Sequence, residues 1–535
     1  MTKNAETQVA IVGAGPVGLA LAIELGLRGV ACILVEQHRG HPRVPRMSGV
    51  SSRNMEFCRR WGIAEKVRGA AWSDTHPSDF VYVESMTGRE LARLPIPSYR
   101  EREGRIDYSP EGSATCPQIY FDPLLAEKAR SVDGVTLRYG TRLESFEQDG
   151  EGVRAHVVDS RSGEPGTVSA RYLVGCDGAG GTVRRELGIP LDGQGTIARS
   201  VNIFFRSPRF MEMHDKGWAR FFRCFDEDGC WGEAIGIDGR ELWRLSVFHD
   251  SAPDLAGHSY LRKLAGRDFE YEILDVSPWE RRDFVARSFR SGRVLIAGDA
   301  AHEASPTGGA GMHIGVCETV NLAWKLAALL DGWGGGGLLD SYQTESKPIA
   351  ERIVELSTRT YDALAALPGG EAFRRAFEDD PDILLALTLP EQLRAQFCYE
   401  ESPICVPDGT PPPEGADALL PSARPGTRAP HCWIAEGQSM LDLFGGGFVL
   451  VRFGAAPPDV SPVAAAAARA SVPLEVVDID RPEAAELYGR RLVLVRPDGH
   501  VAWRSDMPPD DPAALIDCVC GAARGQFGTG KAKGR

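Results

Sequence analysis

The sequence lacks the paired cysteines that a redox or structural metal site requires. Its 12 cysteines are scattered through 535 residues. None forms a C-x-x-C pair, and Cys518 and Cys520, which come nearest to one, form C-x-C. Structural zinc sites and catalytic dithiols depend on such pairs, so the sequence predicts no metal site. Scattered cysteines are typical of a reducing cytoplasm, where we expect the protein to reside.

Long apolar runs and an excess of basic residues are also absent. No run approaches the roughly 18 apolar residues of a membrane-spanning helix. The polar start MTKNAET leads directly into a predicted strand, without the apolar stretch of a signal peptide. Acidic residues outnumber basic ones by 74 to 60, and the net charge of −14 argues against nucleic acid and anionic membranes as partners. With 43% hydrophobic residues, the composition indicates a globular protein of about two or three domains.

What the sequence does have is a glycine motif inside a strand–turn–helix–strand pattern over residues 9–37. An apolar run precedes Gly13, Gly15 and Gly18, and a second apolar run ends at Glu36. In such a G-x-G-x-x-G motif the first glycine permits a tight turn, the second lets the backbone approach a pyrophosphate, and the third lets the helix pack on the strand. An acid at the end of the second strand suits a free ribose 2′-hydroxyl. The motif predicts a site for FAD or NAD rather than NADP; the alternative is a glycine-rich turn without a ligand.

A second glycine-rich segment lies far downstream. The apolar run at 294–297 ends in Gly298-Asp299, and a turn rich in Pro and Gly leads into a helix-like stretch that reaches Ala327. We therefore expect Asp299 where a strand ends, close to a helix N-terminus. The free N–H groups and partial positive charge of such a terminus suit a polar cofactor tail and an electron-rich ring.

A third motif follows the apolar run at 172–175. It comprises Asp177-Gly178 and a basic stretch with Arg184 and Arg185. Taken alone, it is also consistent with a strand, a turn and the solvated start of a basic helix.

These three motifs, in their order and spacing along the chain, resemble those of the FAD-dependent aromatic hydroxylases with the para-hydroxybenzoate hydroxylase fold. The resemblance is specific over about residues 8–365 and points to the phenol hydroxylase and aromatic polyketide hydroxylase branch. It implies an α/β protein in which a Rossmann-type FAD-binding domain is interleaved with an antiparallel-sheet substrate domain, followed by a C-terminal thioredoxin-like α/β domain. Because the last domain lacks a C-x-x-C pair here, we expect it to serve structure or homodimer formation rather than redox chemistry.

The resemblance also assigns cofactor contacts. In that family G-x-G-x-x-G binds the ADP half of FAD, the DG motif serves both FAD and the pyridine nucleotide, and the GD aspartate binds the ribityl chain. Arg46 resembles an arginine that lies against the FAD phosphates or ribityl chain, and Gln118 resembles a polar contact to the flavin. The assigned residues are Gly13, Gly15, Pro16, Gly18, Glu36, Gln37, Arg46, Gln118, Asp177, Gly178, Gly298, Asp299, Pro306, Gly309, Gly311, Met312 and His313.

Two positions depart from the family pattern. Gly181 replaces a serine usually found beyond the DG motif, which leaves the contact to nicotinamide undetermined. His313 stands where the GD motif usually ends in asparagine. A histidine beside the flavin could take part in proton transfer, since its ordinary pKa is about 6.5. The alternative is a helix-start residue with local hydrogen bonds.

The expected organisation has four parts. They are an FAD-binding domain with a helical extension, a substrate domain predicted from period-2 segments, a Pro-rich linker and the thioredoxin-like domain. The FAD-binding domain with its helical extension is expected at residues 1–70, 111–190 and 286–400, and the substrate domain at 71–110 and 191–285. The linker is expected at 401–425 and the thioredoxin-like domain at 426–535.

One face of the predicted substrate sheet carries side chains that suit a flat aromatic substrate. Aromatic residues would sandwich its ring, and Arg220 would hold a phenolate or carboxylate. The alternative for each residue is an ordinary place in the sheet core. The flavin is expected to carry the chemistry, with His313 and Arg220 as candidate catalytic residues. The substrate candidates are Asn202, Phe204, Phe222, Trp231, Glu233 and Trp243.

The resemblance implies a monooxygenase that consumes NADPH or NADH and O2. It would hydroxylate a small phenolic or polycyclic aromatic substrate through a flavin C4a-hydroperoxide. Two alternatives remain. The same scaffold could perform Baeyer–Villiger insertion or oxidative decarboxylation in natural-product tailoring, or the protein could be a non-catalytic carrier of flavin or ligand. The sequence leaves the substrate, the position of hydroxylation and the choice of coenzyme open.

Overall fold

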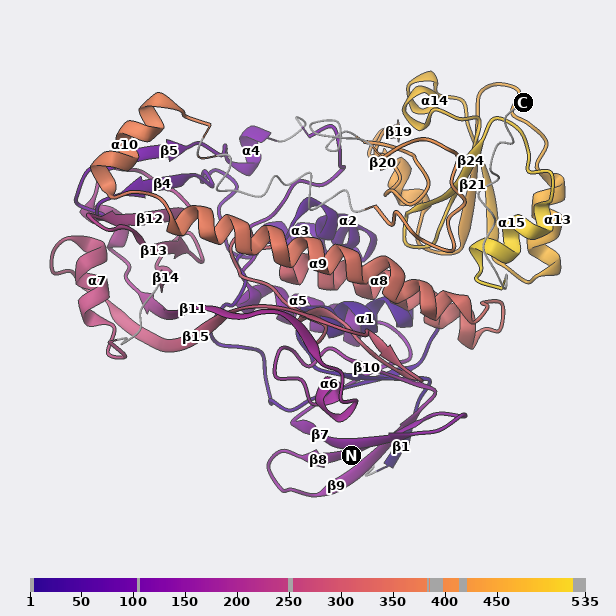
Figure 1. Cartoon of the computed structure of the whole chain (residues 1–535), viewed down its shortest axis with the longest axis horizontal. Coiled ribbons are helices and arrows are strands. Elements are labelled where there is room, and N and C mark those ends of the chain that lie inside the picture. The colour runs from indigo at the N-terminus through magenta and orange to yellow at the C-terminus, as the bar shows by residue number, and fades with distance from the viewer. Residues whose placement is uncertain are drawn as a thin grey trace.

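The computed structural model describes residues 4–102, 106–248, 254–382, 384, 398–412 and 421–522. Within these residues the strands form sheets of six, eight, four, four and two strands. The eight-stranded sheet and the C-terminal domain lie at opposite sides of the molecule, and the long helix α9 (Gly337–Ala365) runs between them (Figure 1). No helix of the described part is long and apolar enough to cross a bilayer.

A six-stranded sheet carries all three glycine motifs at one edge. Its order is β16-β17-β10-β2-β3-β6, and every pairing except β16–β17 is parallel. Parallel strands end at the same edge of a sheet, so the residues that follow β2, β3, β10 and β17 come together there. The strands are β2 (Val9–Val12), β3 (Cys32–Glu36), β6 (Val135–Tyr139), β10 (Tyr172–Gly175), β16 (Arg290–Ser291) and β17 (Val294–Ile296).

Helices cover this sheet and fix the direction in which its motifs point. Helix α1 follows the first glycine motif and packs against α5 and α8. Its residues are mostly apolar and buried, as expected for a helix between a sheet and other helices. The helices are α1 (Pro16–Leu27), α2 (Ser52–Arg60), α3 (Ala64–Arg68), α5 (Gln118–Arg130), α6 (Thr182–Glu186) and α8 (Gly311–Leu330), with the short 3₁₀ turn η2 (Gly298–Ala300) after β17. A four-stranded sheet packs beside them, formed by β1 (Asn4–Glu6), β7 (Thr141–Gln148), β8 (Val153–Asp159) and β9 (Pro165–Ala170).

The eight-stranded sheet is antiparallel except for the pair β12–β4. It draws strands from the two chain segments for which the sequence predicts it, and adds β18 from the GD segment. The order is β18-β15-β11-β14-β13-β12-β4-β5. The strands are β4 (Phe80–Val83), β5 (Glu90–Leu94), β11 (Leu191–Arg206), β12 (Phe221–Asp226), β13 (Gly229–Gly236), β14 (Leu242–Val247), β15 (Glu272–Ala286) and β18 (His302–Glu303). The helical pieces around it are α4 (Tyr99–Arg102), η1 (Phe210–Met213), α7 (His258–Ala265) and α10 (Gly370–Asp379).

The C-terminal domain is built on a four-stranded sheet of order β22-β21-β23-β24. The first pair is parallel and joined through a helix, and the other two pairs are antiparallel. The strands β23 and β24 flank a Pro-Asp-Gly turn at residues 497–499. The elements are β19 (Trp433–Ala435), β20 (Gln438–Ser439), η4 (Met440–Leu443), β21 (Phe448–Phe453), α13 (Ser461–Arg469), β22 (Leu474–Ile479), α14 (Pro482–Tyr488), β23 (Leu492–Val495), β24 (Val501–Ser505) and α15 (Pro512–Val519).

The segment at 401–425, expected as a linker, is described in part. Residues 413–420 lie outside the described residues. The described part is docked: Ile404 is buried in the core of the C-terminal domain, and the Val406 N–H donates to the Ala502 carbonyl at 2.7 Å. Apolar side chains next to the prolines therefore hold this segment on the domain surface.

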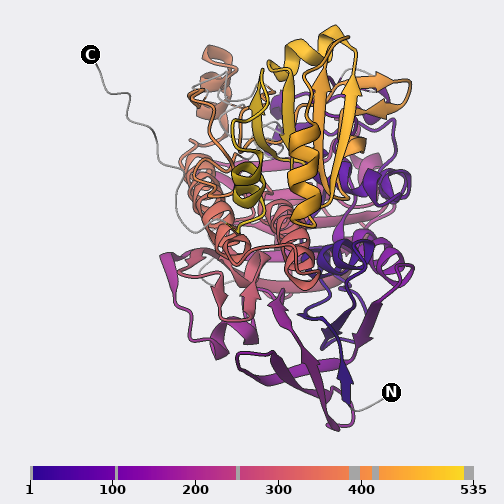
Figure 2. The ribbon, with the colours of Figure 1, turned by 90° about the vertical axis from the view of Figure 1, so that its right-hand side faces the viewer.

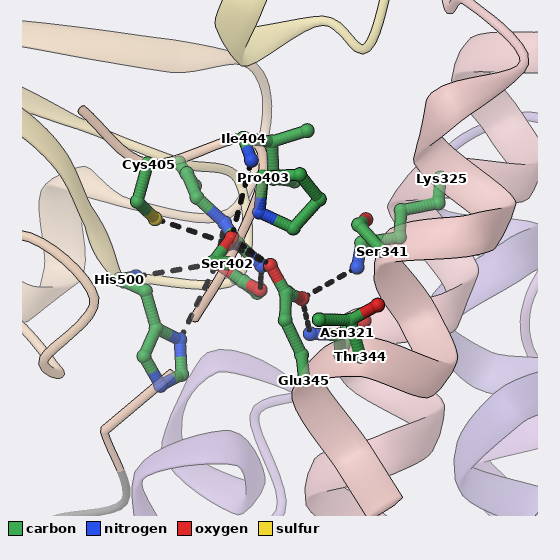
Figure 3. Close-up of polar contacts among 12 residues, drawn as sticks. Asn321, Lys325, Ser341, Thr344, Glu345, Ser402, Pro403, Ile404, Cys405 and His500 are labelled. Atoms are coloured by element: carbon green, nitrogen blue, oxygen red, sulfur yellow. Dashed lines mark hydrogen bonds and ion pairs between the residues drawn. The ribbon is translucent and has the colours of Figure 1, made fainter. Parts of the chain in front are cut away.

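The C-terminal domain lies against α8 and α9 (Figures 1 and 2), and a buried polar network joins them. Glu345 of α9 lies between Asn321 and Lys325 of α8 on one side and Ser402 on the other (Figure 3). Arg496, from the turn between β23 and β24, also donates to Glu345, at 2.6 and 3.0 Å. Because α8 begins at Gly311, next to the cavity described below, this network connects the C-terminal domain to that cavity.

Candidate active site

A cavity of about 2540 Å³ lies at the carboxyl edge of the six-stranded sheet and reaches the eight-stranded sheet. Its walls include Glu36, Asp177 and Asp299 from the first sheet and Asn202 and Glu233 from the second. Drug-sized ligands fill cavities of roughly 300–1,000 Å³. The cavity therefore has room for a dinucleotide together with a second ligand.

The first glycine motif leaves open space where a pyrophosphate would approach. Gly13 has φ +104°, and a Cβ there would lie 2.3 Å from the Cys176 carbonyl oxygen. A Cβ on Gly18 would lie 2.0 Å from the Gly13 carbonyl oxygen. A Cβ on Gly15 would meet no atom within 4 Å. Two glycines thus permit close packing of turn, helix and strand, and the middle one faces space that a ligand can occupy.

The ends of β3 and α1 supply an acid and free N–H groups at the same place. The Glu36 carboxylate accepts from the Ala14 N–H at 2.9 Å and from the His38 N–H at 2.8 Å. These bonds fix the carboxylate at the cavity wall while each oxygen keeps a lone pair for a ribose hydroxyl. Gly15 caps α1 without a side-chain hydrogen bond, so first-turn N–H groups of α1 are available to a phosphate.

Asp299 reaches the cavity from the turn after β17. Its side chain is exposed to the cavity interior, and Gly311 at the start of α8 lies 4.0 Å from its Oδ1, measured from an ideal Cβ. Surrounding protein atoms nevertheless desolvate the carboxyl and raise its pKa. A hydroxyl donor in the cavity would stabilise the charged form.

Two residues that sequence reasoning missed hold this turn in place. Glu318 of α8 accepts from the Gly298 N–H at 2.9 Å and pairs with His302 Nε2 at 2.9 Å. Both side chains are buried, and the Glu318 carboxylate and Asp299 raise the pKa of His302 against the effect of burial. The sequence signal that could have identified Glu318 is that it is an acidic residue within the otherwise apolar first half of α8.

Gln118 connects the arginine loop to a buried acid. Its Oε1 accepts from the Arg46 N–H at 3.3 Å, and its own N–H donates to the Met47 carbonyl at 3.1 Å. Its Nε2 donates to Asp122 Oδ2 at 3.0 Å. The sequence missed Asp122, although it follows Gln118 by four residues and therefore shares its helix face. Asp122 is fully buried and borders the cavity.

Asp122→Asn is expected to stabilise the ligand-free protein in a pH-dependent manner. Burial raises the pKa of Asp122 from its ordinary 3.8 to about 7. The folded protein holds this proton between about pH 4 and pH 7, where the unfolded chain has lost it, so stability falls as pH rises through that window. Asparagine removes the titration. The variant should gain up to roughly 4 kcal/mol over the parent at pH 8 and almost nothing at pH 4.

Thermal unfolding of parent and variant at both pH values measures this difference. Glu127→Gln, at an exposed carboxylate on the same helix, should leave the pH profile near that of the parent. An Asp122→Asn variant with the same profile as the parent would contradict the assignment.

Asp177 and Gly178 form the wall of the cavity beside β10. Asp177 Oδ2 accepts from the Val183 N–H at 3.0 Å, and burial raises the pKa of the carboxyl. At Gly181 a Cβ would lie 2.4 Å from Asp177 Oδ1. The glycine that departs from the family pattern therefore allows this loop to fold closely around Asp177.

The donor and acceptor pattern fits a dinucleotide. Within the described residues, Asp122 Oδ1 and Asp177 Oδ1 are buried without a hydrogen-bond partner, and both residues border the cavity. Buried carboxylate oxygens are costly when left unsatisfied, and ribose hydroxyls and ring amino groups are donors that would satisfy them.

Most residues that the sequence assigns to the cofactor line this cavity. Gly18 and Gly298 do not, and lie behind it in the turns that shape the wall. His313 is buried in the first turn of α8 and borders the cavity. The lining residues from the predicted set are Gly13, Gly15, Pro16, Glu36, Gln37, Arg46, Gln118, Asp177, Gly178, Asp299, Pro306, Gly309, Gly311, Met312 and His313.

The predicted substrate set divides between the two faces of the eight-stranded sheet. Asn202, Arg220 and Glu233 line the cavity. The structure corrects three of the other four predictions, because Phe222, Trp231 and Trp243 lie in the core on the opposite face, which α7 covers. Phe204 lies on the cavity side of the sheet, in a small cluster with Ile235 and Ile237, and does not itself line the cavity.

Alternation along the strands explains two of these corrections, and a bulge explains a third. Phe222 and Trp243 are each adjacent in their strand to a residue that lines the cavity, so their side chains lie on the opposite face of the sheet. Trp231 lies at a break in the β12–β13 register, since Cys224 pairs with Gly232 and Phe225 pairs with Cys230. The bulge turns Trp231 toward α7, where Lys263 Nζ lies 4.4 Å from its ring.

Other sheet residues that the sequence analysis missed take their places on the cavity wall. Phe221 stacks on Phe80 with ring centroids 4.2 Å apart. Both faces of the sheet are buried, so alternation of apolar residues could not identify the cavity face. The additional lining residues from the sheet include Phe221, Arg223, Arg244, Ser246, Trp279 and Arg281.

Comparison with known proteins matches two family models to this chain. One, described as an FAD binding domain, matches residues 6–357, and the other, described as aromatic-ring hydroxylase, C-terminal, matches residues 422–523.

An aklavinone 12-hydroxylase of Streptomyces purpurascens is 33% identical over 539 residues, which cover 96% of this chain and 98% of that protein. A tetracenomycin B2 monooxygenase-dioxygenase of Streptomyces olivaceus is 32% identical over 554 residues, with coverage of 96% and 98%. The structure of the rebeccamycin biosynthetic enzyme RebC with reduced flavin is similar with a TM-score of 0.89 at 39% identity, and the match covers 97% of this chain and 100% of that chain.

Proposed function

This chain belongs to the FAD-dependent aromatic-ring hydroxylases, and we propose that it hydroxylates a phenolic or polycyclic aromatic substrate with NADPH or NADH as electron donor and O2 as oxygen source. The observation that carries the proposal is the continuous cavity. It joins the edge of the six-stranded sheet, where the glycine motifs lie, to a polar and aromatic face of the eight-stranded sheet. Such an arrangement brings a cofactor and a flat substrate into one cavity.

The residues on the sheet edge fit FAD. The turn at Gly13–Gly18 and the N-terminus of α1 would hold the pyrophosphate, and Glu36 would accept from the ribose. Asp299 would accept from the ribityl chain, and the N-terminus of α8 would face the flavin ring. When bound, FAD supplies electron transfer from the nicotinamide and activation of O2.

The protein's own part in the reaction is binding, orientation and charge stabilisation. The N-terminus of α8 stabilises negative charge on a ring placed against it. Arg220, whose Nη2 donates to Ser48 Oγ at 3.0 Å, lies where it can hold a phenolate. Aromatic side chains such as Trp279 and Phe221 contribute an apolar wall that excludes water.

We infer that the C-terminal domain is thioredoxin-like in topology without redox activity. The order β22-β21-β23-β24, with one parallel and two antiparallel pairs, supports the first part. Cys518 and Cys520 are buried, and burial raises the pKa of Cys518 to about 11, which suppresses the reactive thiolate. Homodimer formation through this domain stays a prediction.

The first experiment is to purify the protein, record its visible spectrum and add NADH or NADPH in air with a panel of phenols. We expect a flavin spectrum, coenzyme oxidation that increases with a phenol, and a product with one added oxygen atom. A colourless protein that cannot be reconstituted with FAD would contradict the proposal. Coenzyme oxidation that no aromatic compound stimulates would favour a carrier, and lactone formation or loss of CO2 would favour the alternative flavoenzyme chemistries.

A further inference from the structure

The cavity face of the eight-stranded sheet carries a row of polar side chains that crosses five strands. Successive cross-strand partners are Arg223 on β12, Glu233 on β13, Ser246 on β14, Asn202 on β11 and Ser277 on β15, and all five line the cavity. Side chains of directly opposed residues project from the same face of a sheet. Because buried polar groups are normally hydrogen-bonded, the bonds within this row show which polar atoms remain for a ligand.

Two pairs of neighbours in the row bind each other. Arg223 Nε donates to Glu233 Oε2 at 2.9 Å, and Arg223 Nη1 donates to the Tyr82 hydroxyl at 3.0 Å. The Ser246 hydroxyl donates to Asn202 Oδ1 at 2.7 Å, so it does not donate to Glu233. The Glu233 carboxylate is therefore held from one side only, through Oε2.

The second carboxylate oxygen of Glu233 has no partner in the described part of the protein. No residue there donates a hydrogen bond to Oε1, and the side chain keeps 15% of its surface exposed on the cavity wall. A carboxylate is an acceptor only, so the ligand group that meets Oε1 must be a donor. An aromatic hydroxyl group is such a donor, and the proposed substrate class carries it.

Glu233 also lies where the sheet meets the arginine loop. Its strand β13 runs between β12 and β14. Arg220, directly before β12, donates to Ser48 Oγ at 3.0 Å, and Arg244 of β14 donates to the Pro45 carbonyl at 2.7 Å. Both acceptors belong to the arginine loop, which is expected to lie against FAD. A ring whose hydroxyl binds Oε1 would therefore lie close to the cofactor.

We propose that Glu233 is a catalytic residue that binds a hydroxyl group of the aromatic substrate through Oε1 and takes up its proton during hydroxylation. The proposal rests on the function proposed above and deepens it by assigning the proton acceptor. Arg223 fixes the other oxygen of the carboxylate, so Oε1 is positioned before the substrate binds.

The proton transfer follows the electrons of the ring. As the ring takes up one oxygen atom of O2, a ring electron pair forms the new C–O bond, and the electron pair of the O–H bond forms C=O. The proton passes to Oε1. A carboxylate is a much weaker base than a phenolate, but the hydroxyl becomes strongly acidic once the ring has given up its electron pair. The ring then regains aromaticity: the oxygenated carbon loses its proton to water, and Glu233 returns a proton to the ring oxygen. The second atom of O2 leaves as water, with electrons from NADPH or NADH.

The first test measures binding to the FAD-containing protein without coenzyme. The probes are 2-naphthol and 2-methoxynaphthalene, in which a methyl group replaces the hydroxyl proton. Calorimetry should show roughly tenfold to hundredfold tighter binding of 2-naphthol, as expected for a hydrogen bond to a charged group. Glu233→Gln should remove most of this preference, because its amide oxygen pairs with Arg223 and its NH2 group faces the cavity. Glu233→Asp should retain part of the preference.

The second test follows turnover of the phenol that gives the most hydroxylated product with the parent. Glu233→Gln should slow hydroxylation by roughly a hundredfold, which is the lower end of what a positioned acid–base group contributes. Less product should form per coenzyme oxidised, and Glu233→Asp should restore part of the yield. A purely structural role of the pair with Arg223 would instead lower stability and weaken both probes equally.

Glu272→Gln provides the matched control. Glu272 lies on the same sheet but pairs with Arg206 at 2.8 Å on the surface, so the preference and the product yield should stay those of the parent. Flavin content and thermal unfolding establish that each variant is folded. If Glu233→Gln fails to fold, Glu233→Asp decides, since a side chain shorter by one methylene should lose part of the preference.

Equal binding of both probes by the parent, or a preference that is unchanged in the folded Glu233 variants, would overturn the proposal. Hydroxylation by Glu233→Gln at the parent's rate would overturn the proton transfer. Phenol-stimulated coenzyme oxidation by the parent is measured separately, so failure of the Glu233 assignment is distinguishable from failure of the proposed function.

Discussion

Asp299→Ala is expected to weaken FAD binding and lower the flavin content of the purified protein. Asp299 faces the cavity at the end of β17, beside the start of α8. Glu318 fixes the preceding turn through the Gly298 N–H and His302, so the carboxylate is held ready for hydroxyl donors. Each hydrogen bond to a charged group contributes about 1.5–3 kcal/mol. Its loss should weaken FAD binding by at least about tenfold, and more if two hydroxyls are bound.

The ratio of flavin to protein absorbance after gel filtration measures this loss, and titration of the apoprotein with FAD gives the affinity. Asp340→Ala is the matched control, since Asp340 is an exposed acid that pairs with Arg290 at 2.9 Å on the adjacent strand β16. It should retain full flavin. An Asp299→Ala protein that purifies with full flavin content would sink the assignment of Asp299 to the ribityl chain.

The cofactor edge was predictable because its signals are local. Gly13, Gly15 and Gly18 follow one strand directly, and their spacing alone dictates a tight turn before a helix. Asp177 and Asp299 likewise follow strands that pair in parallel in the same sheet, so their convergence follows from topology. Asp122 shows the limit of this reasoning. Asp122 became a candidate for the site because its Oδ1 is buried without a hydrogen-bond partner. Only the three-dimensional packing reveals this.

The cavity face of the eight-stranded sheet was predicted only in part, for a physical reason. Strand alternation separates two faces, but it identifies the cavity face only when the other face is wet. Here Phe221 and Phe222 are both suitable for burial, and the first lines the cavity while the second packs under α7. The bulge at Trp231 also changes which face of the sheet its side chain takes. No local sequence signal predicts the bulge, or which of Phe221 and Phe222 faces the cavity.

The domain junction was invisible in the sequence because its contacts join distant residues. Arg496 and Glu345, which are 151 residues apart, form a buried pair at 2.6 Å. Asp498 accepts from Arg496 at 2.6 Å and from Trp324 of α8 at 3.3 Å, and its carbonyl accepts from Arg53 of α2 at 3.0 Å. The C-terminal domain thereby holds α8, whose first turn lines the cavity, and α2, whose N-cap Ser51 lines it. These contacts give a domain without a C-x-x-C pair a structural role.

Glu345→Ala is expected to weaken the attachment of this domain to α8 and α9 and to lower its stability. The side chain of Glu345 is fully buried and accepts from Lys325, Arg496, Asn321 and Ser402. Burial alone would raise its pKa, but the charges of Arg496 and Lys325 lower it to about 2. Removing one partner of a buried ion pair typically costs about 3–5 kcal/mol, because the other charge stays buried without compensation. For a domain of about 100 residues this corresponds to a fall of roughly 10 °C or more in its unfolding temperature.

Differential scanning calorimetry, together with hydrogen exchange of α8 and of β21–β24, measures this effect. The lowered pKa also sets its pH dependence: the carboxylate stabilises the folded state above about pH 4.5, and this stabilisation is lost as the pH falls toward 2. Glu355→Ala, at an exposed position on the same helix that pairs only with Arg359 within the described residues, should change stability by no more than about 0.5 kcal/mol. A Glu345→Ala protein that unfolds at the parent's temperature would show that the ion pair contributes nothing net. The C-terminal domain would then be held by its apolar contacts with Trp324 and Leu338, and its docking would persist in acid.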